Sequence, residues 1–241
     1  MQFKDSGKMK AITFSFDDGV SQDLRMVQLL DKYGLKATFH ICSNRLGRHG
    51  VSVYGGHKVA RYTIAEHHMV DTYAGHEIAA HTLDHVLLPD EKDDAEIIRQ
   101  IEEDRVNLSR IMGYEVVGLA YPGDPAGREN NDDRCIELIR KHTGIQYARA
   151  VSSSGISPCF QMPQNLYKIV PTSGMRTFQE MDKLADQLFE LETDTPRVMM
   201  VMGHCYEMDY ESDHWYKLEQ FFEKISKRDD IFYGTTKEIY L

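Results

Sequence analysis

Strand-like and helix-like segments alternate along nearly the whole chain, and this alternation restricts the fold more than any other feature of the sequence. Runs rich in β-branched and aromatic residues are the expected strands, at 11–16, 37–42, 77–80, 116–121, 147–151, 166–170, 198–202 and 231–233. Amphipathic segments between them are the expected helices, at 22–32, 63–73, 94–112, 132–142, 177–191 and 215–227. Such alternation predicts a parallel sheet whose strands are joined by helical crossovers.

Seven or eight strand–helix units in 241 residues favour an α/β fold similar to a TIM barrel, with eight strands or fewer. An open doubly wound sheet is the alternative. It is disfavoured because no G-x-G-x-x-G or Walker glycine loop follows the first expected strand. No linker interrupts the sequence, so we expect one domain over residues 1–241. The segment 44–62, which is rich in Gly, basic and aromatic residues, is expected to be a long loop over one end of the barrel.

The charge balance limits the classes of partner. The formal net charge is −10, and no run of Lys or Arg stands out. This balance argues against nucleic acids and anionic membranes as partners, and it fits poorly with a strongly anionic substrate. The oligomeric state stays open.

The N-terminal segment lacks the apolar stretch of a secretion signal, and no window approaches the ~20 apolar residues of a membrane span. We therefore expect a cytoplasmic location, unless the sequence has been trimmed. Cys42, Cys135, Cys159 and Cys205 are far apart and form no C-x-x-C motif. Free thiols are expected rather than a disulfide framework or a zinc knuckle.

Two adjacent carboxylates, Asp17 and Asp18, follow the first expected strand. The residues before them alternate between apolar and polar side chains, and the letters DDG are typical of a turn that ends a strand. Neighbouring side chains of a strand face opposite ways, but Gly19 permits a bend that aims both carboxylates into one pocket. Two like charges in one pocket need a cation.

Histidines follow two other expected strands, at the end of the barrel where catalytic groups gather. His81 and His85 are four residues apart, a spacing that lets two imidazoles reach one metal from a turn or a helix. His204 follows the strand at 198–202. One Asp and two His leave a metal position open for water, and the ion lowers the pKa of that water. The second Asp then serves as base and His204 as acid in hydrolysis of an acyl bond.

These motifs resemble those of the polysaccharide deacetylases (carbohydrate esterase family 4), which share the NodB-homology domain. The family motif T-F-D-D-G reads SFDDG at residues 15–19, and H-[S/T]-x-x-H reads HTLDH at residues 81–85. The late family motif L-x-H is similar to MGH at residues 202–204. The motifs occur in the family's order and extend over most of the chain.

The resemblance implies a distorted (β/α)7 barrel and a metal-dependent hydrolase that removes acetyl groups from an N-acetylated or O-acetylated sugar or oligosaccharide. It assigns Asp17 as the catalytic base, His204 as the general acid, and Asp18, His81 and His85 as the metal ligands. Zinc is the expected ion, with Co2+ or Ni2+ as alternatives, because an Asp/His/His set suits these ions.

The family's R-x-P-Y motif is altered in this sequence. It aligns with AYPG, so that Ala120 replaces the arginine and Gly123 the tyrosine. The backbone N–H of Gly123 can still help to bind an oxyanion, because that role needs no side chain. We expect Arg149, in the neighbouring strand, to replace the missing arginine and to donate two parallel hydrogen bonds to Asp17. No D-x-x-D-W motif was found, so the partner of His204 is not predicted.

Two other functions stay open at the sequence level. The first is a metal-dependent hydrolase of the same fold that acts on a non-sugar amide, because the altered arginine motif weakens the assignment of the substrate. The second is a catalytically silent carbohydrate-binding domain, which the complete set of five Asp and His residues disfavours.

Overall fold

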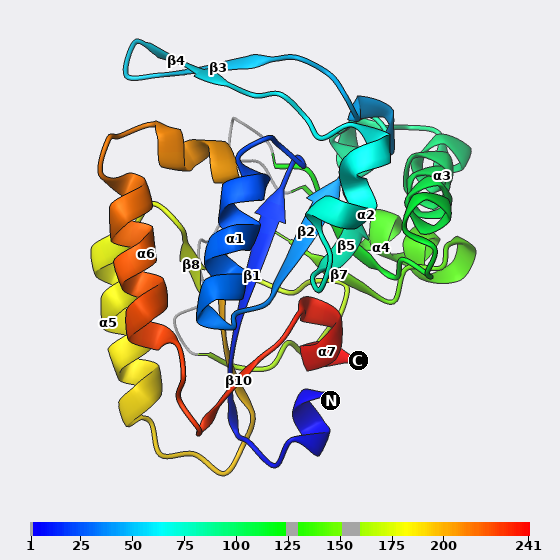
Figure 1. Ribbon diagram of the computed structural model, residues 1–241. Helices are drawn as coiled ribbons and strands as arrows, with labels where there is room; N and C mark the ends of the chain where they lie inside the picture. Colours follow the sequence, from blue (N-terminus) through cyan, green and yellow to red (C-terminus); the bar gives the residue numbers. More distant parts are fainter. Residues whose placement is uncertain (1, 124–129, 151–159) are drawn as a thin grey trace.

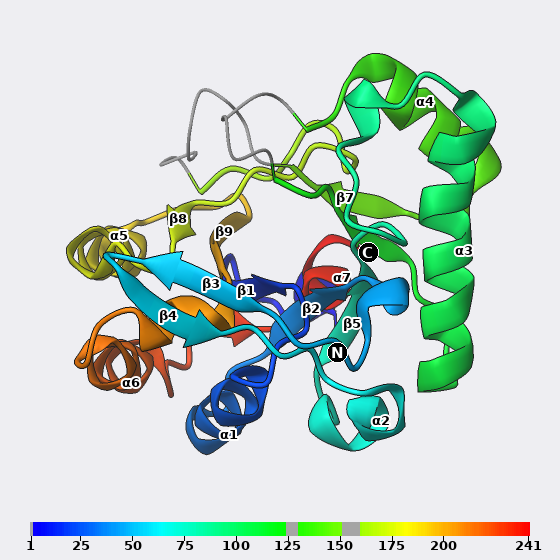
Figure 2. The same cartoon turned by 90° about the horizontal axis from the view of Figure 1, so that it is seen from above.

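The computed structural model describes residues 2–123, 130–150 and 160–241. In this part of the chain, a curled parallel sheet forms the centre and helices cover its outer side (Figures 1 and 2). The strands of this sheet are β1 Lys10–Asp17, β2 Ala37–Ile41, β5 Glu77–Ala80, β6 Gly118–Ala120, β7 Tyr147–Arg149, β8 Ser173–Gly174, β9 Arg197–Gly203 and β10 Ile231–Tyr233.

The strands are ordered β7-β6-β5-β2-β1-β9-β8, and β10 pairs with the beginning of β1. All pairs within this sheet are parallel. The curled parallel sheet with its surrounding helices confirms the predicted distorted (β/α)7 barrel. Of the strand predicted at 147–151, Val151 lies outside the described residues, as does Cys159.

The segment predicted as a strand at 166–170 bridges the two ends of the sheet without forming a regular strand. The Ile169 N–H donates to the Ala148 carbonyl of β7 at 3.0 Å. A few residues later, the Thr172 N–H donates to the Met200 carbonyl of β9 at 2.8 Å. The proline between these contacts has no N–H, so the segment changes its pairing partner there.

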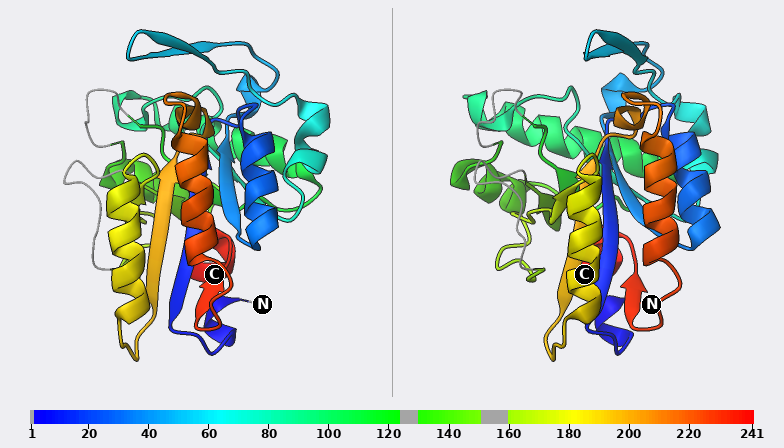
Figure 3. Two further views of the ribbon diagram at one scale, coloured as in Figure 1. Left: turned by 60° about the vertical axis from the view of Figure 1, so that its left-hand side comes forward. Right: turned by 90° about the vertical axis from the view of Figure 1, so that its left-hand side faces the viewer.

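The helices are α1 Asp23–Tyr33, α2 Met69–Thr72, α3 Asp94–Met112, α4 Asp133–His142, α5 Phe178–Glu190, α6 His214–Ile225 and α7 Thr236–Tyr240. The α3 bounds are those predicted, and α5 and α6 pack side by side against the sheet (Figure 3). The helix predicted at 63–73 is wrong in its first half. The Thr63 N–H donates to the Arg48 carbonyl at 2.9 Å, and the Ile64 N–H to the Gly19 carbonyl at 2.8 Å, which holds this part extended.

The segment predicted as a loop at 44–62 contains an antiparallel hairpin, β3 Val51–Tyr54 and β4 His57–Ala60. The two residues between the strands, Gly55 and Gly56, both have positive φ, as the tight turns of hairpins require. The hairpin lies beyond the carboxyl ends of the central strands, as predicted for this segment (Figures 1 and 2).

The strand β1 presents apolar side chains to the outer helices and polar side chains to the interior of the barrel. Phe14 points outward and packs against Phe222 of α6, with ring centroids 5.0 Å apart. Ser15 points inward, and its hydroxyl lies 3.3 Å from Nδ1 of His40 in β2. Buried polar groups need hydrogen-bond partners, and the inward side chains supply them to one another.

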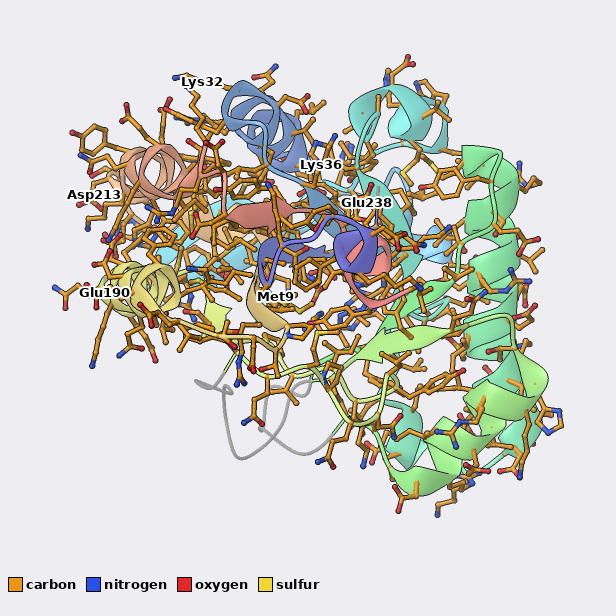
Figure 4. All side chains as sticks on the ribbon, turned by 90° about the horizontal axis from the view of Figure 1, so that it is seen from below. Met9, Lys32, Lys36, Glu190, Asp213 and Glu238 are labelled. Atoms are coloured by element: carbon orange, nitrogen blue, oxygen red, sulfur yellow. The ribbon has the colours of Figure 1, made fainter. Side chains whose placement is uncertain are left out.

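The end of the barrel below the strands is closed by α7 (Figure 4). The Thr236 N–H donates to the Thr38 hydroxyl at 2.9 Å, and the Lys237 N–H donates to the Glu77 carboxylate at 2.9 Å. Access to the interior is therefore from the opposite end, beneath the hairpin. No helix among the described residues is both long and apolar enough to cross a membrane.

Candidate active site

The predicted site residues gather at the carboxyl end of the barrel. Asp17 is the last residue of β1 and Arg149 the last of β7, while His81 and His204 directly follow β5 and β9. The carboxyl ends of parallel barrel strands share one face, which brings these distant parts of the sequence together.

The bend predicted at Gly19 begins one residue earlier. Asp18 has φ of 78° and Gly19 has φ of 61°, both in the left-handed region that non-glycine residues rarely adopt. The turn lets both adjacent carboxylates reach one pair of histidines. Asp17 Oδ2 lies 4.0 Å from His81 Nε2, and Asp18 Oδ1 lies 3.5 Å from His85 Nε2.

Asp18, His81 and His85, the metal ligands predicted from the sequence, lie close enough together to hold one ion, and we refer to them as the metal triad. Each offers one ligand atom, and these atoms all lie within 4.8 Å of one another. Burial is the main cause that lowers the pKa of both histidines, to about 4 for His85, so both imidazoles are neutral near pH 7. Burial works against ionisation of Asp18, but the neighbouring histidines and Arg61 lower its pKa below the ordinary value. Neutral imidazoles and a carboxylate are the forms that bind a metal.

His81 is held in the orientation that a ligand needs. Its Nδ1 lies 2.8 Å from the Ala120 carbonyl, so this nitrogen carries the proton, and its backbone N–H donates to the Asp104 carboxylate at 2.9 Å. The other ring nitrogen, Nε2, is buried and has no hydrogen-bond partner within the described part of the chain. A buried acceptor aimed at two further ligands fits a divalent ion.

Asp17 lies beside the triad and contacts Arg149, the residue proposed to replace the missing arginine. Arg149 Nη2 is 2.6 Å from Asp17 Oδ1 and also contacts the second carboxylate oxygen. The two parallel hydrogen bonds predicted for this pair are therefore wrong, because a single guanidinium nitrogen serves both oxygens. His40 Nδ1, not anticipated from the sequence, is 3.4 Å from Asp17. Burial favours the neutral acid, but Arg149, His81 and His40 hold the pKa of Asp17 well below its ordinary value.

His204 lies on the other side of Asp18. Its Nε2 is 3.9 Å from Asp18 Oδ2, and its Nδ1 is 3.6 Å from Glu207 Oε1. Burial lowers the pKa of His204, but the Glu207, Asp17 and Asp18 carboxylates outweigh it and raise the pKa above its ordinary value. Glu207 is the partner that the sequence motifs did not reveal.

The hairpin segment adds a cation that sequence reasoning missed. Arg61 forms an ion pair with Asp18, and its guanidinium lies over the Tyr206 ring at 4.8 Å from the centroid. At the hairpin tip, Tyr54 stacks on Tyr210, with ring centroids 4.1 Å apart and the rings 5° from parallel. These contacts fix the hairpin over the mouth of the barrel.

Beneath the hairpin, hollows lined by described residues border the site. One, of about 400 Å3, is lined by Tyr54, Arg176 and His204 among others. Another, of about 200 Å3, reaches Asp18 and Arg61. A ligand bound in the larger hollow would lie next to His204, and a ligand bound in the smaller hollow would lie next to Asp18.

Gly123, the predicted oxyanion-binding residue, follows β6 at the same end of the barrel and is exposed. Its N–H makes no hydrogen bond to the described residues. The role of this N–H in binding an oxyanion stays a prediction.

Comparison with known proteins identifies the family. The sequence profile of polysaccharide deacetylases matches residues 4–147. The chain belongs to the polysaccharide deacetylase family. The matched region contains Asp17 and the metal triad but ends before Arg149 and His204, so the argument for these two residues rests on geometry.

Solved structures share the fold at low sequence identity. A probable polysaccharide deacetylase from Pseudomonas aeruginosa is 13% identical with a TM-score of 0.69, and the match covers 99% of this chain and 91% of that one. A mutant of a carbohydrate esterase family 4 pseudoenzyme, with restored activity, is 14% identical with a TM-score of 0.56, and the match covers 98% and 69% of the two chains. A weaker match, which we do not count as a shared fold, is a polysaccharide deacetylase from Bacillus cereus, 17% identical with a TM-score of 0.47. The match covers 64% of this chain and 44% of the Bacillus cereus chain. No curated protein matches the chain significantly.

Proposed function

We propose that this family member is an active metal-dependent deacetylase that releases acetate from an N-acetylated or O-acetylated sugar or oligosaccharide. The observation that carries the proposal is the convergence of an Asp/His/His triad, of which Asp18 and His81 are buried, with a second carboxylate, Asp17, that is not part of the triad. Family membership supports the sugar substrate. The triad supports the dependence on metal.

Asp18, His81 and His85 would hold the ion, and zinc suits this donor set, with Co2+ or Ni2+ as alternatives. A divalent ion in this position supplies Lewis-acid activation of a water molecule and of the acyl oxygen. The protein's own contribution is to present two neutral imidazoles and one carboxylate, with the His81 ring fixed by the Ala120 carbonyl.

Asp17 serves as the general base. Its low pKa keeps it ionised across the neutral range, and Arg149 and His40 hold its carboxylate in one orientation. A positioned carboxylate that accepts a proton in the transition state typically accelerates a reaction about 10²–10⁴-fold.

His204 serves as the general acid for the leaving nitrogen or oxygen. The Glu207, Asp17 and Asp18 carboxylates raise its pKa above the ordinary value, which favours the protonated imidazole. The pKa of Asp17 is lowered and that of His204 is raised, and these are the directions that one base and one acid in a single site require.

Acetate release from a panel of acetylated sugars and acetylated xylan tests the proposal. We expect release by the zinc-loaded protein, loss of most release in Asp17→Asn, and no release after chelation. Bound metal without acetate from any member of the panel would contradict the proposal and favour a non-sugar amide or a silent domain, as in the pseudoenzyme neighbour.

A further inference from the structure

The hollow next to Asp18 is strongly basic, although the chain carries a net charge of −10. Its lining includes four basic side chains, Arg45, Arg48, His49 and Arg61. We refer to it as the basic hollow. The overall acidity of the chain led us to expect a poor fit for a strongly anionic substrate, but charges within a few ångströms of a bound group act on it more strongly than distant surface charges.

The three arginines that line the basic hollow differ in their contacts. Arg61 is paired with Asp18, and Arg45 Nη2 donates to the Asp84 backbone carbonyl at 2.9 Å. The Arg48 guanidinium makes no hydrogen bond or ion pair with the residues that the structure describes. It acts electrostatically on the carboxylate of Asp84, which already accepts from neighbouring amides.

The hairpin pairing aims Arg48 at the site. The Arg61 N–H donates to the Gly50 carbonyl at 2.8 Å, and the Thr63 N–H donates to the Arg48 carbonyl at 2.9 Å, so the ladder continues below the strands. In such a ladder, residues 48, 50 and 61 share the inner face, because side chains alternate. Gly50, which pairs with Arg61 and also lines the hollow, contributes no side chain to this face.

We propose that the basic hollow binds an anionic group, a carboxylate or a phosphate, carried by the acetylated sugar substrate. The inference rests on the proposed function and names the class of sugar that the site accepts. A guanidinium matches the planar oxygens of either group through charge-assisted hydrogen bonds. Arg48, which is exposed and has no hydrogen bond or ion pair with the described residues, supplies the free donors, and Arg61 supplies the charge that connects the hollow to the triad.

Binding of unacetylated sugars tests the subsite without turnover. The probes are glucose, glucuronate and glucose 6-phosphate, titrated calorimetrically into the protein as purified. We expect at least one anionic probe to bind about tenfold more tightly than glucose, the scale of one charge-assisted hydrogen bond. This difference in affinity should become smaller at high salt, because salt screens the charges.

Two variants that each remove one positive charge from the hairpin localise the effect. Arg48→Gln alters the inner face, and Lys58→Gln alters an exposed residue of the outer face. Arg48→Gln should abolish most of the difference in affinity between the anionic probe and glucose, and Lys58→Gln should keep that difference. Equal binding of all three probes, or a difference that survives Arg48→Gln, would overturn the proposal.

The two anionic probes distinguish a carboxylate site from a phosphate site. Different experimental results would contradict the proposed subsite and the proposed function. Absence of acetate release from every acetylated sugar contradicts the function, whereas the binding of the unacetylated probes alone decides the subsite.

Discussion

Arg149 Nη2 lies 2.6 Å from Asp17 Oδ1, and both side chains are almost completely buried in the polar interior of the barrel. The two residues are 132 positions apart in the sequence and meet because β7 and β1 both end at the same face. A buried charge is tolerated only when it is paired. This contact is therefore what allows Asp17 to stay ionised beside the metal triad.

Replacing Arg149 by Met should raise the pKa of Asp17, because the cation that favours its charged form is lost. A general base must be ionised, so the acidic limb of the kcat/KM profile should shift to higher pH. Breaking a buried pair also costs about 3–5 kcal/mol of stability. Arg149→Lys keeps the charge and should show a smaller shift. Normal turnover with an unshifted acidic limb in Arg149→Met would refute this role.

The purified protein should hold about one divalent ion per chain, and zinc is the expected ion. Elemental analysis of dialysed protein measures it. His85→Ala removes the most exposed ligand and should reduce the bound metal, whereas His67→Ala, on the surface, should not. A protein without metal above trace after incubation with zinc at neutral pH would remove the basis of the mechanism.

The adjacent residues Asp17 and Asp18 should separate by role. Asp17→Asn should keep the metal and lose about 10²–10⁴-fold in kcat, the range for a general base. Asp18→Asn should weaken metal binding itself, because Asp18 supplies one of three ligand atoms. Metal titration and acetate release on the same samples give both quantities. Equal metal affinity in the two variants is the result that this assignment does not allow.

The packing beneath the site gives a prediction on stability alone. A Cβ added at Gly118 of β6 would lie 2.1 Å from the Tyr147 hydroxyl oxygen, which is held at 2.8 Å by the Glu77 carboxylate. Gly118→Ala should therefore lower stability by about 1–3 kcal/mol, as overpacking does. Gly174→Ala, where a Cβ meets no atom within 4 Å, is the matched control. Thermal unfolding compares the two.

Much of the fold was predictable from the spacing of apolar residues, because buried positions recur at regular intervals along a strand or a helix. The strand β1 and the helix α3 were predicted within a residue at each end. The hairpin was missed although Gly55-Gly56 between two alternating runs is a hairpin signal. Its polar, basic composition resembled that of a loop, because the hairpin covers the site instead of packing in the core.

Site residues that belong to a short sequence motif were predictable. Site residues that meet only through the path of the folded chain were not. Asp18, His81 and His85 come from two compact motifs whose spacing reflects ligand geometry. Arg61 reaches Asp18 only because the hairpin crosses the barrel mouth. His40 resembles any residue of a strand, and its contact with Asp17 depends on the register of β1 and β2.

Glu207 offers the sharpest test of the acid. Its carboxylate lies 3.6 Å from His204 Nδ1, and it raises the pKa of His204 against the opposite effect of burial. The acid must be protonated, so activity falls as pH rises through that pKa. Removing the charge in Glu207→Gln lowers the pKa, and the basic limb of kcat/KM should shift to lower pH.

Part of the rise in the pKa of His204 remains in this variant, because Asp17 and Asp18 still favour the imidazolium. Glu211→Gln makes the same change of charge at an exposed position nearby and should leave the limb in place. The pH profiles of the three proteins, measured with the same metal content, decide the matter. A basic limb that does not move in Glu207→Gln would show that His204 is not the group titrating there, and the acid would have to be another residue of the barrel mouth.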